Sequence, residues 1–310
     1  MILKPFGKLG WEVSAVGLGC WNIGNQWGDI DDATAWATVR AAYDSGVNLF
    51  DTAESYGIPN GLSEQRLGVA LAGIRHNVFV ISKIGNWGKR TGNGVPKDSV
   101  DMIRLCGHAS LGRLRTDYLD VVLCHEGNVE DPTIYLEGFE ALQQEGAIRA
   151  YGISTNSLEV LKRFNVNGTC SVVQVDYSLL NRAPEDDFLP YCHANGIAVM
   201  VRGPLAMGLL SGRYSKDTQF EDTVRARWHE DTERQAAFEA KVDKVERLKD
   251  AVEPGEPMIT AALRYVITHQ AVSVVIPGAK SPEQARMNAA AGVRVLGDAE
   301  LTSLTARLVD

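Results

Sequence analysis

Several features are missing from this chain of 310 residues, and each absence excludes a class of protein. No stretch approaches the roughly 20 uninterrupted apolar residues that a membrane-spanning helix needs. The first residues, Met1 to Phe6, lack the long apolar run of a secretory signal. The five cysteines are widely spaced and form no Cys-x-x-Cys motif, which favours reduced thiols over a disulfide framework or a zinc knuckle. We therefore expect a cytoplasmic protein that does not enter the membrane.

Common phosphate-binding and metal-binding motifs are also absent. Gly17-Leu18-Gly19 begins like the Gly-x-Gly-x-x-Gly fingerprint of a Rossmann fold, but Asn22 stands where the third glycine is required. No Gly-x-x-x-x-Gly-Lys-Ser/Thr loop occurs, and no His-Glu-x-x-His motif is complete. The sequence therefore predicts neither a Rossmann domain nor a metal site. The net charge of −8, from 31 basic and 39 acidic side chains, argues against general nucleic-acid binding.

The composition that remains is that of a globular protein with a large core. Apolar residues make up 45% of the chain and charged residues 23%, which excludes disorder of the whole. No change in composition marks a boundary, so we expect a single domain over residues 1–310. Strands are expected at residues 13–18, 47–50, 78–82, 118–124, 148–154, 172–175, 197–201 and 272–276. Helices are expected at residues 33–45, 63–72, 97–111, 132–145, 158–164, 188–195, 258–269, 282–291 and 299–308.

The predicted strands are continuous apolar runs rather than alternating ones. Such runs indicate burial on both faces, as in a parallel sheet covered by helices. About eight strand–helix units follow one another, which predicts an α/β fold of the (β/α)8 or TIM-barrel type with further helices at the C-terminus. Residues 86–96 and 214–234 depart from this rhythm and are expected to be surface loops that act as lids over a site. For residues 214–234, an insertion without such a role is an equal alternative.

Polar side chains follow three successive predicted strands, where the active sites of such barrels lie. Asp51 ends one strand and is followed by Tyr56, Lys83 ends the next, and His125 ends the third. Each residue alone has an ordinary structural role, but their joint placement favours acid–base catalysis. A free phenol has a pKa of about 10, and we expect the Lys83 ammonium to lower that of Tyr56. Asp51 would keep Lys83 charged, and His125 would orient a carbonyl oxygen beside the phenol.

The segments around these residues resemble the signatures of the aldo-keto reductase family. They read Phe50-Asp51-Thr52-Ala53-Glu54-Ser55-Tyr56-Gly57, Ile81-Ser82-Lys83-Ile84-Gly85 and Leu123-Cys124-His125. Further similar segments lie at residues 151–156, 174–182, 202–212 and 276–288, so the resemblance runs from Gly7 to about Ala291. It implies a barrel that reduces aldehydes and ketones with NADPH, with Tyr56 as the general acid, Lys83 and Asp51 tuning it, and His125 orienting the carbonyl.

The same resemblance implies a cofactor site. The nicotinamide is expected on Gly19, Cys20 and Trp21, with its carboxamide held by Ser154, Asn156 and Gln174 and its ring stacked on Tyr177. The pyrophosphate side is expected at Arg202, Pro204, Leu205, Gly208, Leu210 and Gly212, and the adenosine phosphate at Gly278, Lys280, Gln284 and Asn288. Lys280 favours NADPH over NADH through its charge, and the helix after Ser281 suits a phosphate. For Arg202, pairing with a neighbouring acidic residue is the alternative.

Other functions stay open at this point. The enzyme could run in reverse as a sugar or alcohol dehydrogenase, or the chain could be a cofactor-sensing regulatory subunit with slow turnover. A lyase or isomerase with a Schiff-base Lys83 would leave Tyr56 and the cofactor-loop resemblance unexplained. Trp21, Trp27, Trp87 and Trp228 could line a pocket for apolar aldehydes or open-chain sugars. A small carbonyl compound is the expected partner, and the oligomeric state is left open.

Overall fold

A computed structural model describes residues 1–89 and 92–308 of the chain. Within these residues, eight parallel strands form one sheet in the order β10-β9-β8-β7-β6-β5-β4-β3. They are β3 (Leu18–Gly19), β4 (Leu49–Asp51), β5 (Phe79–Ile84), β6 (Leu119–Cys124), β7 (Ile148–Ser154), β8 (Val172–Asp176), β9 (Ala198–Arg202) and β10 (Val272–Val275). Parallel bridges from Val16 to Val275 and from Gly19 to Gly278 join the two edges of the sheet. The predicted (β/α)8 barrel is confirmed.

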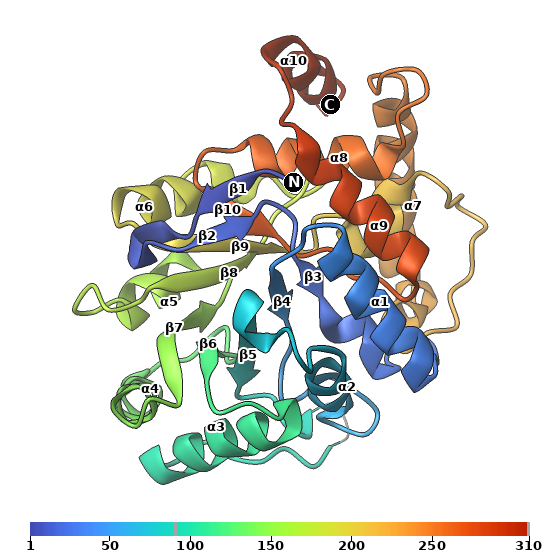
Figure 1. The fold of residues 1–310 in the computed structure, drawn as a ribbon. Coiled ribbons are helices and arrows are strands. Elements are labelled where there is room, and N and C mark those ends of the chain that lie inside the picture. The colour runs from blue at the N-terminus through green and yellow to red at the C-terminus, as the bar shows by residue number, and fades with distance from the viewer. Residues whose placement is uncertain (90–91, 309–310) are drawn as a thin grey trace.

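Helices alternate with the strands and cover the outside of the sheet (Figure 1). They are α1 (Asp32–Asp44), α2 (Leu62–Ala70), α3 (Val100–Leu114), α4 (Thr133–Gln144), α5 (Leu158–Phe164), α6 (Phe188–Ala194), α7 (Thr232–Lys249), α8 (Met258–Thr268), α9 (Pro282–Ala290) and α10 (Asp298–Ala306). Asp31, Ser99, Ser157, Asp231 and Ser281 each accept the backbone N–H three residues on, which caps α1, α3, α5, α7 and α9. No described helix is both long and apolar enough to cross a membrane.

Both faces of the sheet are buried, as the continuous apolar runs predicted. Ile81, Val121 and Ala198 belong to the cluster inside the barrel, whereas Val80 and Val122 pack in the cluster under the helices. Because neighbouring residues of a strand point to opposite faces, a strand buried on both sides has to be largely apolar. A polar side chain within such a strand needs a partner: Asp120 of β6 is fully buried and pairs with Arg75 at 2.9 Å and Arg149 at 2.6 Å.

An N-terminal hairpin covers one end of the barrel, and the sequence did not predict it. Its strands are β1 (Leu3–Pro5) and β2 (Glu12–Ser14), which pair antiparallel. Phe6 and Trp11 stack at 6.1 Å and join the interior cluster, with Phe6 fully buried. The strand predicted at residues 13–18 is wrong in extent, because the chain passes from hairpin β2 into barrel strand β3 within that stretch. The hairpin leaves the opposite end of the barrel, where the strands end, for a site.

The two predicted surface loops have different outcomes. Residues 214–231 are largely irregular and contain the short 3-10 helix η7 (Ala226–His229), but residues 232–234 already belong to α7. That helix was not predicted, although Phe238, Val242, Val245 and Leu248 bury one stripe of it at helical spacing. In the loop at residues 86–96, residues 90–91 lie outside the described part of the chain. The lid role of both loops stays a prediction.

Candidate active site

The ends of β4 and β5 bring Asp51, Tyr56 and Lys83 into direct contact. Lys83 is fully buried, and its ammonium donates hydrogen bonds in three directions. The acceptors are the Asp51 carboxylate at 2.7 Å, the Thr52 carbonyl oxygen at 2.8 Å and the Tyr56 hydroxyl at 3.1 Å. A lysine ammonium has three protons, so this set satisfies all of them. The arrangement fixes the ammonium beside the phenol.

His125 faces Tyr56 from the end of β6. The two rings lie edge to face, with centroids 5.8 Å apart and an interplanar angle of 79°. The His125 backbone is held on both sides, because its N–H donates to the Ile84 carbonyl at 2.7 Å and its carbonyl accepts from the Asn86 amide at 2.8 Å. The structure thus places the four residues proposed for catalysis around one point at the barrel mouth.

Burial dominates the protonation of this cluster. It raises the pKa of Tyr56 above the ordinary phenol value, and the Lys83 ammonium opposes this rise only in part. Burial alone would lower the pKa of Lys83, but attraction to Asp51 and Tyr56 outweighs it, so this pKa is raised. Burial also raises the pKa of Asp51, against the effect of Lys83. Lys83 therefore acts on the Tyr56 pKa in the expected direction, but burial outweighs it, so the net shift is upward and the phenol stays protonated beside the amine.

Gln174 supports the Asp51 carboxylate from across the barrel. Its side-chain amide is buried and donates to Asp51 Oδ1 at 2.8 Å. Ser154, at the end of β7, is paired in register with Gln174 and is also buried. Gly19 at the end of β3 is likewise paired with Asp51. Gly19, Ser154 and Gln174 therefore lie on strands whose ends surround the cluster.

Tryptophan side chains form a wall beside Tyr56. Trp21 stacks on the phenol ring at 5.6 Å with an interplanar angle of 20°, and Trp27 meets Trp21 edge-on at 5.0 Å. Gln26, which is buried, accepts hydrogen bonds from the Trp21 indole at 2.5 Å and from the Gly57 backbone N–H at 3.0 Å. The sequence reading missed Gln26, because an isolated glutamine in a loop carries no motif. It joins the Trp21 loop to the Tyr56 loop.

A buried ion pair behind Tyr56 was also missed. Glu54 accepts the Gly85 backbone N–H at 2.8 Å and lies 3.3 Å from the Lys97 ammonium, and both charged side chains are almost completely buried. Glu54 precedes Tyr56 by two residues, while Gly85 follows the strand that carries Lys83. The pair therefore fixes the two strand exits relative to one another. In the sequence, the only indication of this pair was the charged Glu54 between the small residues Ala53 and Ser55.

The structure does not bring Tyr177 to this mouth. Its side chain is 1% exposed, its hydroxyl donates to Glu185 at 2.7 Å, and its ring packs 6.0 Å from the rings of both Tyr265 and His269. Tyr265 belongs to α8, outside the sheet. Because side chains alternate along a strand, Gln174 points to the cluster and Tyr177, three residues later, points outward. The predicted stacking of Tyr177 on a nicotinamide is contradicted by this burial.

Arg202 occupies the mouth instead. It ends β9 opposite Asp176 of β8, donates to Asn156 Oδ1 at 3.0 Å and lies 4.0 Å from the Asp176 carboxylate. Burial dominates the raised pKa values of Asp51 and Tyr56, and the positive charge of Arg202 acts against it at both groups. The charge of Arg202 thus acts on the cluster. Asp176 is the acidic residue that the sequence left open as a partner of Arg202.

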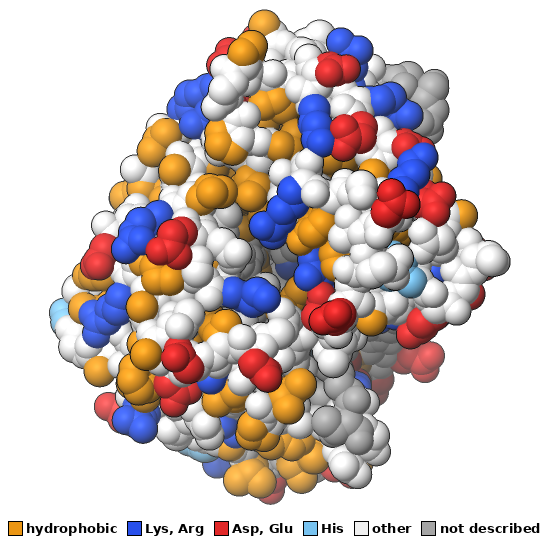
Figure 2. All heavy atoms as spheres, turned by 90° about the vertical axis from the view of Figure 1, so that its right-hand side faces the viewer, with side chains coloured by type: hydrophobic (Ala, Val, Ile, Leu, Met, Phe, Trp, Pro, Cys, Tyr) orange, Lys and Arg blue, Asp and Glu red, His pale blue; other side chains and the backbone are white. Residues whose placement is uncertain are grey.

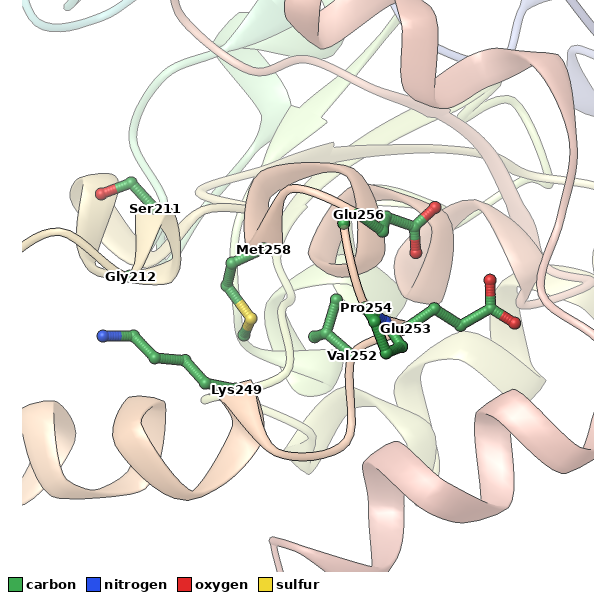
Figure 3. Close-up of a pocket in the computed structure, with 9 residues that line it drawn as sticks. Ser211, Gly212, Lys249, Val252, Glu253, Pro254, Glu256 and Met258 are labelled. Carbon is green, nitrogen blue, oxygen red and sulfur yellow. The ribbon is translucent and has the colours of Figure 1, made fainter.

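The loop after β9 contains the predicted pyrophosphate residues. Residues 204–212 form the 3-10 helix η6 (Ala206–Ser211) and its flanks, in which Met207 has a left-handed φ of 56°. Pro204 and Leu210 are buried, Leu205 and Gly208 are partly exposed, and Gly212 ends the helix with a φ of 70°. A pocket of about 300 Å³ adjoins Gly212 and is bordered by Lys249 and Met258, whose side chains Figure 3 shows extending from α7 and α8. None of the four residues proposed for catalysis lines this pocket.

The predicted phosphate residues after β10 are held together at the start of α9. The Lys280 backbone N–H donates to Gln284 Oε1 at 2.9 Å, and the buried Asn288 amide donates to the Gly278 carbonyl at 3.2 Å. The Lys280 ammonium donates to the Trp27 carbonyl at 2.7 Å, which links this loop to the tryptophan wall. A lysine at a helix N-terminus combines a point charge with free backbone N–H groups, a combination suited to phosphate.

One face of the molecule is hollowed. Figure 2 shows the side that carries the segment between β9 and α7, with a hollow near its centre and Lys and Arg side chains around it. The Cys20 thiol is fully buried, and burial raises its pKa. Within the described part of the chain, no three His, Cys, Asp or Glu side chains are grouped to hold a metal ion.

A closed barrel with a buried tyrosine–lysine–aspartate set and an imidazole at the strand ends defines a barrel enzyme with an acid–base site. The model of the "Aldo/keto reductase family" matches residues 15–308, and the chain belongs to this family. It is an oxidoreductase family, in agreement with the resemblance that the strand-end motifs carry.

Several known proteins are similar over almost their whole length. The NADH-specific methylglyoxal reductase of Escherichia coli is 32% identical over 325 residues, covering 96% of this chain and 95% of the relative. The holo form of an aldo-keto reductase from Bacillus halodurans has a TM-score of 0.83 and 30% identity, covering 99% and 96% of the two chains. An aldo-keto reductase from Klebsiella pneumoniae, solved in complex with NADPH, has a TM-score of 0.75 and 29% identity over 99% and 95%.

Proposed function

We propose that the protein reduces aldehydes and ketones to alcohols with NADPH, with Tyr56 as the proton donor. One observation carries the proposal: the Lys83 ammonium touches both the Tyr56 hydroxyl and the Asp51 carboxylate at the end of the barrel strands. Membership of the aldo/keto reductase family supports it, as does the NADPH complex of the Klebsiella relative. Cytoplasmic location and a single domain over residues 1–310 remain parts of the same proposal.

The side chains at the mouth have the chemistry that NADPH needs. Lys280 and the first N–H groups of α9 suit the phosphate of the adenosine, and the amides of Asn156 and Gln174 suit the carboxamide. Trp21 adds a flat aromatic wall next to Tyr56. When bound, NADPH supplies the hydride to the carbonyl carbon. Because the E. coli relative is NADH-specific, Lys280 is the residue on which our preference for NADPH depends.

The proton chemistry belongs to the chain itself. Tyr56 donates its hydroxyl proton to the carbonyl oxygen and becomes a phenolate. The Lys83 ammonium, 3.1 Å from that oxygen, stabilises the new negative charge, and Asp51 keeps Lys83 protonated. His125 offers a ring N–H to the same carbonyl oxygen and so orients the substrate. Trp21 covers one face of the phenol, which limits the access of water to the reacting group.

The proposed substrates are small aldehydes and ketones, including open-chain sugars. An aromatic wall of Trp21 and Trp27 suits both apolar carbonyl compounds and the carbon face of a sugar. The E. coli relative acts on methylglyoxal, a small compound of this class. The reverse reaction, oxidation of an alcohol or sugar, uses the same site with Tyr56 as the base.

The test combines turnover with cofactor binding. Purified protein is mixed with NADPH and a panel of aldehydes, and loss of NADPH absorbance is followed for the wild type, Tyr56→Phe and the control Tyr177→Phe. We expect kcat of Tyr56→Phe to fall by about 10²–10⁴-fold with little change in NADPH affinity, since general acid catalysis contributes that much. Tyr177→Phe should keep its kcat. Tight NADPH binding without turnover of any carbonyl would favour a regulatory subunit, and absence of NADPH binding would refute the proposal.

A further inference from the structure

We infer that Arg202 makes the site discriminate between the two oxidation states of the cofactor, by weakening the binding of NADP⁺ relative to NADPH. The inference rests on the proposed function. It gives this arginine a different role from a phosphate contact, which would affect NADPH and NADP⁺ equally. It depends on the position of Arg202, on the incomplete neutralisation of its charge, and on the change of charge that hydride transfer causes.

The guanidinium of Arg202 is held at the reacting end of the site. Its Nη2 donates to Asn156 Oδ1 at 3.0 Å, and the same oxygen accepts the Asp176 backbone N–H at 3.0 Å. Asn156 is therefore fixed by the strand end, and it fixes Arg202 in turn. Arg202 ends β9, which pairs with β8, and β8 carries the Gln174 amide that donates to Asp51 at 2.8 Å. The positive charge therefore lies on the strand end next to the one that reaches the catalytic cluster. A cation placed in this way acts on whatever binds next to Tyr56.

The charge of Arg202 is only partly neutralised, in contrast to that of Lys83. Lys83 is fully buried and has the Asp51 carboxylate at 2.7 Å, so the two charges cancel over short distances. Arg202 has Asp176 at 4.0 Å, and these side chains are 40% and 35% exposed. An ion pair at this distance with water access to both partners is weak. Asp176 therefore leaves most of the positive charge of Arg202 uncompensated.

The reaction changes the charge of the nicotinamide and not that of Arg202. The balanced reduction converts a carbonyl compound, NADPH and a proton into an alcohol and NADP⁺, in which the hydride goes to carbon and the Tyr56 proton goes to oxygen. The carbon that accepts the hydride is bonded to the oxygen that meets Tyr56, so the ring has to bind close to this hydroxyl. The reduced ring is neutral and the oxidised ring is positive. Arg202 therefore repels NADP⁺ and leaves NADPH nearly unaffected, which favours product release after carbonyl reduction.

The competing role for Arg202 is a contact with the pyrophosphate. The two roles predict different affinities, because the phosphates carry the same charge in both oxidation states. A phosphate contact stabilises NADPH and NADP⁺ equally, whereas a cation beside the ring changes the ratio of their dissociation constants. That ratio is independent of turnover.

The experiment measures Kd for NADPH and NADP⁺ by calorimetry in wild type, Arg202→Gln, Arg202→Lys and Lys280→Gln. Arg202→Gln removes the charge and keeps a donor for Asn156, and Arg202→Lys keeps the charge. We expect Kd(NADP⁺)/Kd(NADPH) to fall about tenfold in Arg202→Gln, the size expected for one partly screened charge. The ratio should stay near the wild-type value in Arg202→Lys. In Lys280→Gln both constants should rise together, because we assign that residue to a phosphate of the cofactor.

The outcomes separate the inference from the function on which it rests. An equal rise of both constants in Arg202→Gln would place the guanidinium at the pyrophosphate and overturn the inference, as would no change in either constant. Either result leaves the proposed reductase intact. A wild-type protein that binds neither nucleotide would refute both. Circular dichroism of each variant checks the fold, and Arg202→Lys gives a second charge-dependent comparison if Arg202→Gln is unstable.

Discussion

Replacing Lys83 with methionine separates the chemical role of the ammonium from its role in folding. In the wild type, this side chain is fully buried and donates to Asp51, Thr52 and Tyr56. Methionine has a similar length and fills the same space without a charge or a donor. The substitution therefore leaves the barrel interior packed but removes the only partner that we assign to the phenolate of Tyr56.

The expected loss of turnover follows from the 3.1 Å distance between the Lys83 ammonium and the Tyr56 hydroxyl. At an effective dielectric constant of about 20, two unit charges at this distance attract one another by about 5 kcal/mol. The phenolate forms only as the proton leaves, so this energy lowers the barrier and not the energy of the bound substrate. We expect kcat for carbonyl reduction to fall by about 10³–10⁴-fold, since each 1.4 kcal/mol is about tenfold. NADPH affinity should change by less than about threefold.

The expected loss of stability has another origin. Removing one partner of a buried ion pair leaves an uncompensated charge, which costs about 3–5 kcal/mol. Burial already raises the pKa of Asp51 in the presence of Lys83, and loss of the ammonium raises it further. A carboxyl with a raised folded-state pKa is tolerated when protonated, so the deficit should shrink as pH falls and grow as pH rises through that pKa. Urea unfolding at several pH values measures this.

The double variant Asp51→Asn, Lys83→Met is the control for this pair. It removes both charges, so most of the stability should return while turnover stays low. Rapid single-turnover measurement with saturating NADPH reports the chemical step in all three proteins. If Lys83→Met kept kcat within about tenfold of the wild type, the ammonium would not be the partner of the phenolate, and our account of proton donation would be wrong.

Three further predictions concern pH, the outer layer and the sheet. Because burial raises the pKa of Tyr56, the rate of carbonyl reduction should stay constant through neutral pH. Alcohol oxidation needs the phenolate, so its rate should rise as the pH rises toward and beyond about 10. Rate–pH profiles in both directions test this, and a fall in the reduction rate between pH 6 and 8 would contradict it. Tyr177→Phe removes one donor to Glu185, which also accepts from Tyr265 and Arg182, so stability should fall by about 1–2 kcal/mol with unchanged NADPH affinity. Weaker NADPH binding would return Tyr177 to the cofactor site. Gly152→Ala should fail to give folded protein, because a Cβ there would lie 1.7 Å from the Val172 carbonyl oxygen. The control Gly112→Ala on α3 places its Cβ in open space and should be tolerated. A stable Gly152→Ala protein would show that β7 and β8 can separate.

The strand positions and the catalytic cluster could be predicted from the sequence because both follow from burial. A barrel strand covered on both faces is mostly apolar, so β5, β6 and β7 appear as apolar runs with few polar interruptions, such as Asp120 in β6 and Arg149 in β7. A polar residue directly after such a run then marks a strand end, and Asp51, Lys83 and His125 stand there. Parallel strands place their ends at one edge, which brings these residues together without any knowledge of long-range contacts.

The parts that failed depend on tertiary contacts. The hairpin of β1 and β2 is short and is stabilised by Phe6 inside the barrel, a contact that no local pattern reveals. Helix α7 has a low content of apolar residues, so its narrow buried stripe was hidden among charges. Tyr177 follows a polar strand end like the catalytic residues do, but its direction depends on the alternation along β8 and on Glu185, eight residues away.

The protonation of Tyr56 shows why residue types alone do not determine chemistry. The sequence places a lysine near the phenol, and an exposed pair of this kind would have a lowered phenol pKa. In the folded protein burial has the larger effect, so the phenol remains neutral until a substrate oxygen can take its proton. The Lys83 ammonium nevertheless lies 3.1 Å from the phenol oxygen, and Asp51 offsets the cost of burying its charge. Its attraction to Tyr56 acts only when the negative charge forms. A neutral donor next to a compensated cation thus binds the ground state weakly and the transition state strongly, which is the difference that accelerates a reaction.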